Sequence, residues 1–112
     1  MKGTDRYRVA GVSCSYGDRV LLVANLSVGG FFVETTDSPG KGSVIKLTLS
    51  LPGAPPPIPM VGTVAWVNGR DRLRSPTLPP GFGFKVKQIG FREKMAILAY
   101  LRRYQPTTTR DR

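Results

Sequence analysis

The sequence predicts an all-β domain, a small six-stranded antiparallel barrel that ends in one α-helix. Three observations support this fold class. Short segments rich in β-branched and aromatic residues recur between residues 7 and 89, glycine and proline clusters separate them, and helical spacing of apolar residues begins only after residue 90. Closure into a barrel rather than a sandwich stays open here, because both alternate polar and apolar residues in the same way.

The first two strands are expected over residues 7–16 and 19–27, joined by Gly17-Asp18. A two-residue turn with glycine first is typical of a type II′ hairpin. Such a turn pairs Tyr16 with Arg19. Continuing that register without interruption predicts that Arg8 lies opposite Ser27 and that Arg6 lies near Gly29.

Four more strands follow, each bounded by residues that form turns. Gly29-Gly30 precedes the third, residues 31–35, and a turn at residues 37–40 precedes the fourth, residues 43–51. In the fourth strand, leucine and isoleucine alternate with lysine, threonine and serine, which indicates one buried and one solvated face. A proline loop and a basic loop bracket the fifth strand, residues 60–67, and the sixth covers residues 81–89.

Residues 91–104 have the apolar spacing of an amphipathic helix. The apolar stripe consists of Phe91, Met95, Leu98 and Leu101. It is expected to pack on the barrel, with a dimer or partner interface as the alternative, so the chain is a monomer or a homodimer. One domain is predicted over residues 1–104, followed by a flexible polar tail at residues 105–112.

Composition favours a binding protein over an enzyme. The chain has 112 residues, a net charge of +10 from 17 basic and 7 acidic side chains, and no histidine. A basic surface attracts anions, while the most common general base is absent. No metal-ligand cluster, cofactor motif or signal peptide is evident, so the expected location is the cytoplasm. Nucleic acid is not the expected partner, since exposed aromatic residues interleaved with basic ones are not apparent beyond Tyr7.

Several conspicuous side chains are expected to be structural. Cys14 lies in a predicted strand of a chain without histidine, which indicates a buried, inert thiol. Trp66 lies in the middle of a predicted strand and is expected in the core. The same expectation holds for four phenylalanines, Phe31, Phe32, Phe82 and Phe84.

One rim of the predicted sheet gathers groups suited to a phosphorylated purine. The candidate binding residues are Arg6, Arg8, Asn25, Ser27, Gly29 and Gly30. Arginine can form two hydrogen bonds with a phosphate and can stack on a base, and glycine allows close approach of the backbone. The alternative is a plain turn after the second strand beside a solvated basic arm.

The string Asn-x-Ser-x-x-Gly at Asn25, Ser27 and Gly30 resembles the signature of the PilZ domain family. The strand that contains Trp66 and the Gly-Phe-Gly-Phe strand at residues 81–84 are also similar to that family. The resemblance covers roughly residues 6–89. It implies a six-stranded antiparallel barrel, cyclic di-GMP as the ligand, and a protein partner in a bacterial motility or second-messenger pathway.

The chain departs from the family pattern at its N-terminus, where an Arg-x-x-x-Arg motif is usual. Here Arg6 and Arg8 are two positions apart, and Lys2 with Arg6 is the only basic pair at the family spacing. Lysine does not reproduce a forked arginine contact. The resemblance predicts a cyclic di-GMP receptor, and the missing Arg-x-x-x-Arg favours the alternative, a protein-interaction adaptor that does not bind the nucleotide.

Overall fold

The computed structural model describes residues 6–53, 56–69 and 73–103 of the chain. The tail expected at residues 105–112, the basic residue Lys2, and Arg70 and Arg72 of the basic loop lie outside these residues. The elements are β1 (Tyr7–Arg8), β2 (Ser13–Tyr16), β3 (Arg19–Leu26), β4 (Gly30–Glu34), β5 (Val44–Ser50), β6 (Ile58–Asn68), β7 (Gly81–Gln88) and α1 (Phe91–Leu101).

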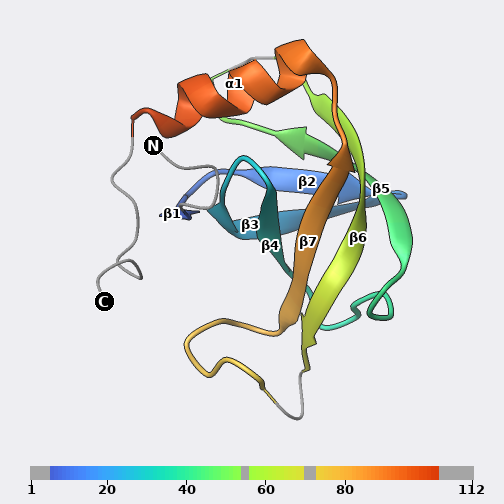
Figure 1. The fold of residues 1–112 in the computed structure, drawn as a ribbon. Coiled ribbons are helices and arrows are strands. Elements are labelled where there is room, and N and C mark those ends of the chain that lie inside the picture. The colour runs from blue at the N-terminus through green and yellow to red at the C-terminus, as the bar shows by residue number, and fades with distance from the viewer. Residues whose placement is uncertain (1–5, 54–55, 70–72, 104–112) are drawn as a thin grey trace.

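The strands form one antiparallel sheet that closes on itself. Their order is β1-β3-β2-β5-β6-β7-β4, and β4 also pairs with β3. Strands β2 to β7 therefore make a closed ring of six, and β1 is an additional short strand beside β3 (Figure 1). The predicted six-stranded antiparallel barrel with a C-terminal helix is confirmed, and the sandwich is not formed.

The first hairpin begins as predicted. Tyr16 lies opposite Arg19, and the turn glycine, Gly17, has a φ of +63°. A positive φ at the first turn position is a feature of the type I′ and type II′ turns that join two-residue hairpins, and glycine adopts it without a steric cost.

The continuous strand expected over residues 7–16 is instead divided into β1 and β2. Val9 and Val12 still bond to β3, through Val9 N–H to Ala24 O at 3.3 Å and Val23 N–H to Val12 O at 3.0 Å. The two residues between them bulge out, and Gly11 takes a φ of +76°.

This interruption shifts the register of β1, so the predicted pairing of Arg8 with Ser27 is wrong. Arg8 lies opposite Asn25, and Tyr7 lies opposite Leu26. Bulges are known to re-aim the residues of a strand in this way. Here the shift moves Arg8 two residues along β3 from the position that an unbroken hairpin would give it.

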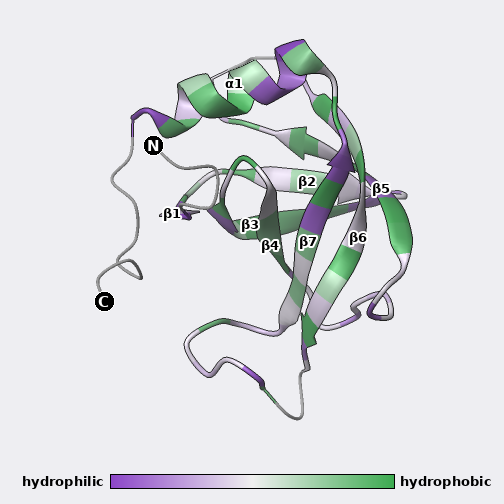
Figure 2. Cartoon of the chain, in the orientation of Figure 1, coloured by the Kyte–Doolittle hydropathy of each residue, from purple (hydrophilic) through white to green (hydrophobic). Residues whose placement is uncertain are grey.

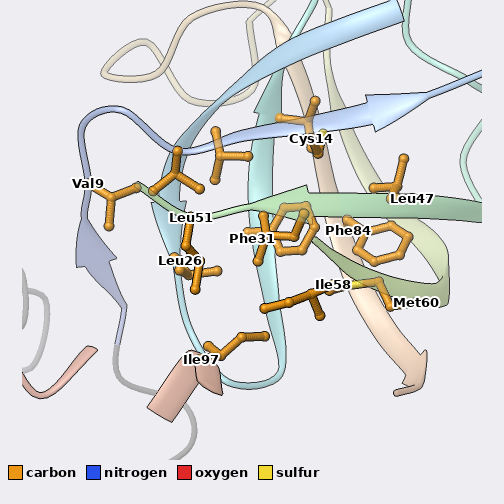
Figure 3. Packing of buried hydrophobic residues seen from close by; sticks show 14 of the residues in the cluster. Val9, Cys14, Leu26, Phe31, Leu47, Leu51, Ile58, Met60, Phe84 and Ile97 are labelled. Carbon is orange, nitrogen blue, oxygen red and sulfur yellow. The ribbon is translucent and has the colours of Figure 1, made fainter. Parts of the chain in front are cut away.

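The barrel interior is filled by alternate residues of every strand. Its aromatic centre is Phe31 of β4 against Phe84 of β7, with ring centroids 5.0 Å apart. Leu47 and Leu49 of β5 also lie in this cluster, as the alternation predicted. Cys14 is fully buried in the same cluster (Figure 3), and burial raises the pKa of its thiol to about 12. The predicted inert thiol is therefore a buried neutral group.

Helix α1 covers one end of the barrel (Figure 1). Ile97 points into the core cluster near Leu26 and Ile58 (Figure 3), and Tyr100 and Leu101 are buried with it. None of the described residues forms a helix long and apolar enough to cross a bilayer.

The predicted apolar stripe of this helix is largely on its outer side. Leu101 is buried, but Phe91 is 77% exposed, Met95 is 39% exposed and Leu98 is only half-buried. The stripe fails because α1 approaches the barrel through Ile97 and Tyr100, about a third to a half of a turn away from Phe91 and Met95 on the helix surface. In the first turns of α1 the exposed residues Phe91 and Met95 therefore stand on either side of Arg92 and Lys94 in the sequence, where the ribbon of the helix shows both hydrophobic and hydrophilic colours (Figure 2).

Candidate functional site

A row of paired residues crosses the outer face of the barrel. Arg8 pairs with Asn25, Asn25 with Phe32, Phe32 with Gly83, and Gly83 with Trp66. Directly opposed residues of neighbouring strands project to the same face of a sheet. The row therefore joins the basic N-terminal strand β1 to the tryptophan of β6 across β3, β4 and β7.

Two bulges turn this row outward. In β3 the pairing with β4 moves directly from Val23 to Asn25, so Ala24 is an extra residue. In β6 the pairing with β7 moves from Val64 to Trp66, so Ala65 is extra. Simple alternation from the buried residues Val23 and Val64 would have turned Asn25 and Trp66 inward.

The prediction that Trp66 belongs to the core is therefore wrong. Its indole is half-buried and packs on Phe32 from outside, with ring centroids 5.4 Å apart. Phe32 is buried as predicted, but beneath Trp66 and not in the interior cluster that contains Phe31, Phe82 and Phe84.

Two glycines of β7 make room for these rings. A Cβ on Gly83 would lie 2.2 Å from Nε1 of Trp66, and a Cβ on Gly81 would lie 2.9 Å from the ring of Phe32. Any side chain at these positions would lift the aromatic rings off the strand. The Gly-Phe-Gly-Phe pattern thus gives the barrel a bulky inner face and a bare outer face on which Trp66 lies.

Ser27 forms the turn between β3 and β4. Its hydroxyl donates to the carbonyl of Gly30 at 2.9 Å and accepts from the N–H of Gly30 at 3.1 Å. The Ser27 N–H also donates to Gly30 O at 2.8 Å. Both hydroxyl contacts are used within the turn, so Ser27 holds Gly29 and Gly30 in position at the rim.

Arg6 is anchored to the predicted signature. Its Nη1 donates to Oδ1 of Asn25 at 2.9 Å. Although Arg6 is an exposed residue overall, desolvation beside the barrel wall lowers the pKa of its guanidinium from the usual value. The guanidinium stays charged at neutral pH, because arginine titrates far above it. The hydrogen bond to Asn25 therefore holds a positive charge at the rim of the barrel.

A cavity of about 360 Å³ opens beside Arg6, and we call it the Arg6 pocket. It lies over strands β4, β6 and β7 and the β3–β4 turn. Its lining residues are Arg6, Ser27, Gly29, Gly30, Ala65, Trp66, Gly83, Phe84 and Lys85. The pocket combines two cations, an indole and exposed glycine backbone, a set that can hold a phosphate and stack on a base.

The structure brings most of the predicted site residues together. Arg6, Ser27, Gly29 and Gly30 line the pocket, and Asn25 contacts it through Arg6. Arg8 is exposed beside Asn25 and does not line the pocket.

Sequence reasoning missed five of the lining residues, and two of these, Trp66 and Lys85, bring an indole and a cation to the pocket. The signal for Trp66 was the pair of glycines at alternate positions in the first half of β7, Gly81 and Gly83, which leaves a bare surface for a large ring. Lys85 is exposed on the outer face of β7. It pairs with Gly30, so the same face carries it to the pocket (hydrophilic bands of β7, Figure 2).

Sequence reasoning also missed Asn68, which organises the loop after β6. Asn68 is fully buried. Its amide donates to the carbonyls of Ser75, Leu78 and Pro79 at 2.9–3.2 Å, and its carbonyl accepts from the Ser75 N–H at 2.8 Å. One side chain therefore determines where this loop meets the barrel. Arg74, next to Ser75, is held 5.5 Å above the ring of Trp66.

A model of the PilZ domain family matches residues 6–103 of this chain, from the pocket arginine to the end of α1. The chain belongs to the PilZ domain family. PilZ domains are binding and adaptor domains of cyclic di-GMP signalling and not enzymes, which agrees with a site built from cations, glycines and an indole. No curated protein sequence matches the chain.

Among solved structures, the inhibitor of motility from Bacillus subtilis, MotI/DgrA, is similar. The TM-score is 0.70 at 21% sequence identity. The match covers 88% of this chain and 48% of that protein, so this PilZ domain spans about half of its structural neighbour. At this identity the likeness concerns the fold.

Proposed function

We propose that this PilZ domain is a cyclic di-GMP receptor that holds the nucleotide in the Arg6 pocket. The observation that carries the proposal is the convergence of Arg6 with Ser27, Gly29 and Gly30 on one cavity, despite the altered spacing of the N-terminal arginines. The family motif residues Asn25, Ser27 and Gly30 supply the rim.

Each group has a role in this proposal. The guanidinium of Arg6 binds a phosphate or the O6 and N7 edge of guanine. Lys85 neutralises phosphate charge, and the part of the Trp66 indole that lines the pocket offers an apolar surface to a base. Gly29 and Gly30 let the ligand approach the backbone of the turn closely. No cofactor is involved.

Arg6 takes the part that a pair of arginines is expected to share in the family. Arg8 points to the same face but is displaced from the pocket by the register of β1. We therefore expect Arg6 to contribute more to affinity than Arg8. The same arrangement predicts weaker binding than two pocket arginines would give, in the micromolar range.

Calorimetric titration with cyclic di-GMP tests the proposal, with GMP and a short RNA as comparison ligands. Arg6→Ala removes a charge-assisted contact and should weaken binding about tenfold or more. Arg92→Ala, which removes the same charge from α1, is the matched control and should leave affinity within about twofold. No heat with cyclic di-GMP at high concentration, or equal losses in both variants, would reject the receptor.

A second function, an adaptor that binds a protein and not the nucleotide, is favoured by one observation. The outer side of α1 presents Phe91 and Met95 to solvent, between basic side chains. A large exposed aromatic side chain with apolar neighbours is typical of a protein interface. If the calorimetric titration shows no binding of cyclic di-GMP, the adaptor is the function that remains. In either case we propose a cytoplasmic location and a partner in a motility or second-messenger pathway.

A further inference from the structure

A second basic cavity adjoins the Arg6 pocket. Its volume is about 450 Å³, and we call it the Arg74 pocket. Its lining residues are Lys41, Ala65, Trp66, Arg74 and Ser75. Ala65 and Trp66 belong to both cavities, so the outward bulge of β6 is a wall shared by the two.

Both cations of the Arg74 pocket sit on segments that are bonded to the barrel. The turn that carries Lys41 is tied to β6 by Gly42 N–H to Val64 O at 2.8 Å and by Val64 N–H to Ser43 O at 2.9 Å. The loop that carries Arg74 is tied by the four hydrogen bonds of Asn68. The backbone of both segments is therefore held in place before any ligand arrives, which lowers the entropic cost of binding.

The charge of this pocket is not neutralised within the part of the chain that the structure describes. Among the described residues, Arg19 forms an ion pair with Asp37 at 3.5 Å, and neither Lys41 nor Arg74 forms one. Arg74 instead lies over the indole of Trp66 in a cation–π contact, and its side chain is exposed, so that an anion can reach it. Two cations that form no ion pair with the described residues, beside one aromatic ring, suit a phosphate linked to a base.

We propose that the Arg74 pocket is a second subsite for the dinucleotide. One nucleotide half occupies the Arg6 pocket, and the phosphate of the other half binds Arg74 and Lys41 beside Trp66. This proposal rests on the proposed receptor function and adds the residues that distinguish a dinucleotide from a mononucleotide. The mononucleotide fills one pocket, while the dinucleotide reaches past the shared wall into both.

The test compares cyclic di-GMP with GMP on the full chain. In the double variant Lys41→Ala/Arg74→Ala, affinity for cyclic di-GMP should fall about tenfold or more, because at least one charge-assisted hydrogen bond to the phosphate is lost. Affinity for GMP should change by less than about threefold, since the Arg6 pocket is intact. The double variant Arg92→Ala/Lys94→Ala removes the same charge from α1 and is the control for the overall field. Thermal unfolding of both variants checks that they remain folded.

Trp66 supplies a second readout because it is the only tryptophan in the sequence. Saturation with cyclic di-GMP should change its fluorescence, and the change should be smaller in the Lys41→Ala/Arg74→Ala variant. If the parent chain binds the dinucleotide and this variant binds it as tightly as the helix control does, the second subsite is rejected and the receptor stands. If the parent chain binds no dinucleotide, both proposals are rejected together.

Discussion

At the scale of single residues, the site is formed by a few side chains whose partners are specific. Ser27 uses its hydroxyl to close the β3–β4 turn, and Arg6 is oriented by Asn25. Ser27 and Asn25, the two signature residues in these contacts, therefore make hydrogen bonds within the folded protein as well as standing where a ligand would bind. Substitutions at Ser27 are therefore expected to alter the turn as well as affinity, whereas Arg6 can be removed with less effect on the fold.

Cys14 gives a prediction that concerns one atom. Burial raises the pKa of its thiol from 9.0 to about 12 because the thiolate would be desolvated in the core. We expect the folded protein to resist a thiol reagent at pH 8 and to react promptly once unfolded in urea. Stoichiometric labelling of the folded chain on the same timescale as the unfolded chain would contradict this, and a Cys14→Ala variant supplies the blank.

The same shift has a consequence for stability. The unfolded chain releases the thiol proton near pH 9.0, whereas the folded chain holds it until about pH 12. Because the unfolded state then binds fewer protons, the contribution of this group to stability is complete below pH 9.0 and is lost as the pH rises towards 12.

At the scale of elements, glycines determine how closely strands and rings approach. A Cβ on Gly30 would lie 2.2 Å from the carbonyl oxygen of Phe84 in the neighbouring strand β7. Nothing lies within 4 Å of a Cβ on the adjacent Gly29. Gly30 therefore has to be small because the neighbouring strand leaves no room for a Cβ. The position of Gly29 has room for a side chain, and its lack of one leaves the backbone accessible to a ligand.

This difference predicts that alanine at Gly30 lowers the stability of the protein much more than alanine at the neighbouring Gly29. Gly30→Ala should lower the free energy of unfolding by about 1–3 kcal/mol or more, since backbone atoms must move. Gly29→Ala should change it by about 0.5 kcal/mol or less. Urea denaturation of both variants measures the difference, and equal stability of the two would show that the β4–β7 contact is less close than described.

At the scale of the whole molecule, the barrel is closed around its sides by hydrogen bonds and at one end by helix α1. The β3–β4 pairing completes the ring, and Ile97, Tyr100 and Leu101 complete the core. The opposite side of the helix keeps Phe91 and Met95 in solvent. The helix therefore belongs to the folding unit while leaving two large apolar side chains exposed to solvent.

A pair of helix variants tests this division. Ile97→Ala leaves a cavity at the end of the barrel and should cost about 2–5 kcal/mol of stability. Phe91→Ala removes a larger side chain but should cost about 0.5 kcal/mol or less, because that ring is exposed. Thermal unfolding followed by circular dichroism compares them. A greater loss from Phe91→Ala than from Ile97→Ala would mean that the helix packs through its other face.

Local patterns in the sequence were sufficient to predict much of the secondary structure of this protein. Alternation in residues 43–51, the Gly17-Asp18 turn and the change to helical spacing after residue 90 predicted strand, hairpin and helix, because each depends on neighbours in the chain. The signature at Asn25, Ser27 and Gly30 likewise indicated the family.

Only the tertiary structure decided which residues face one another. The bulges at Ala24 and Ala65 and the interruption near Gly11 each insert residues that leave the hydrophobic pattern almost unchanged, yet they reverse faces or shift register. They put Trp66 outside the barrel, carry Arg8 past the pocket and turn Asn25 toward Arg6. Such choices depend on pairing between strands distant in sequence, since the energy of a bulge is recovered only in contacts that the folded barrel makes.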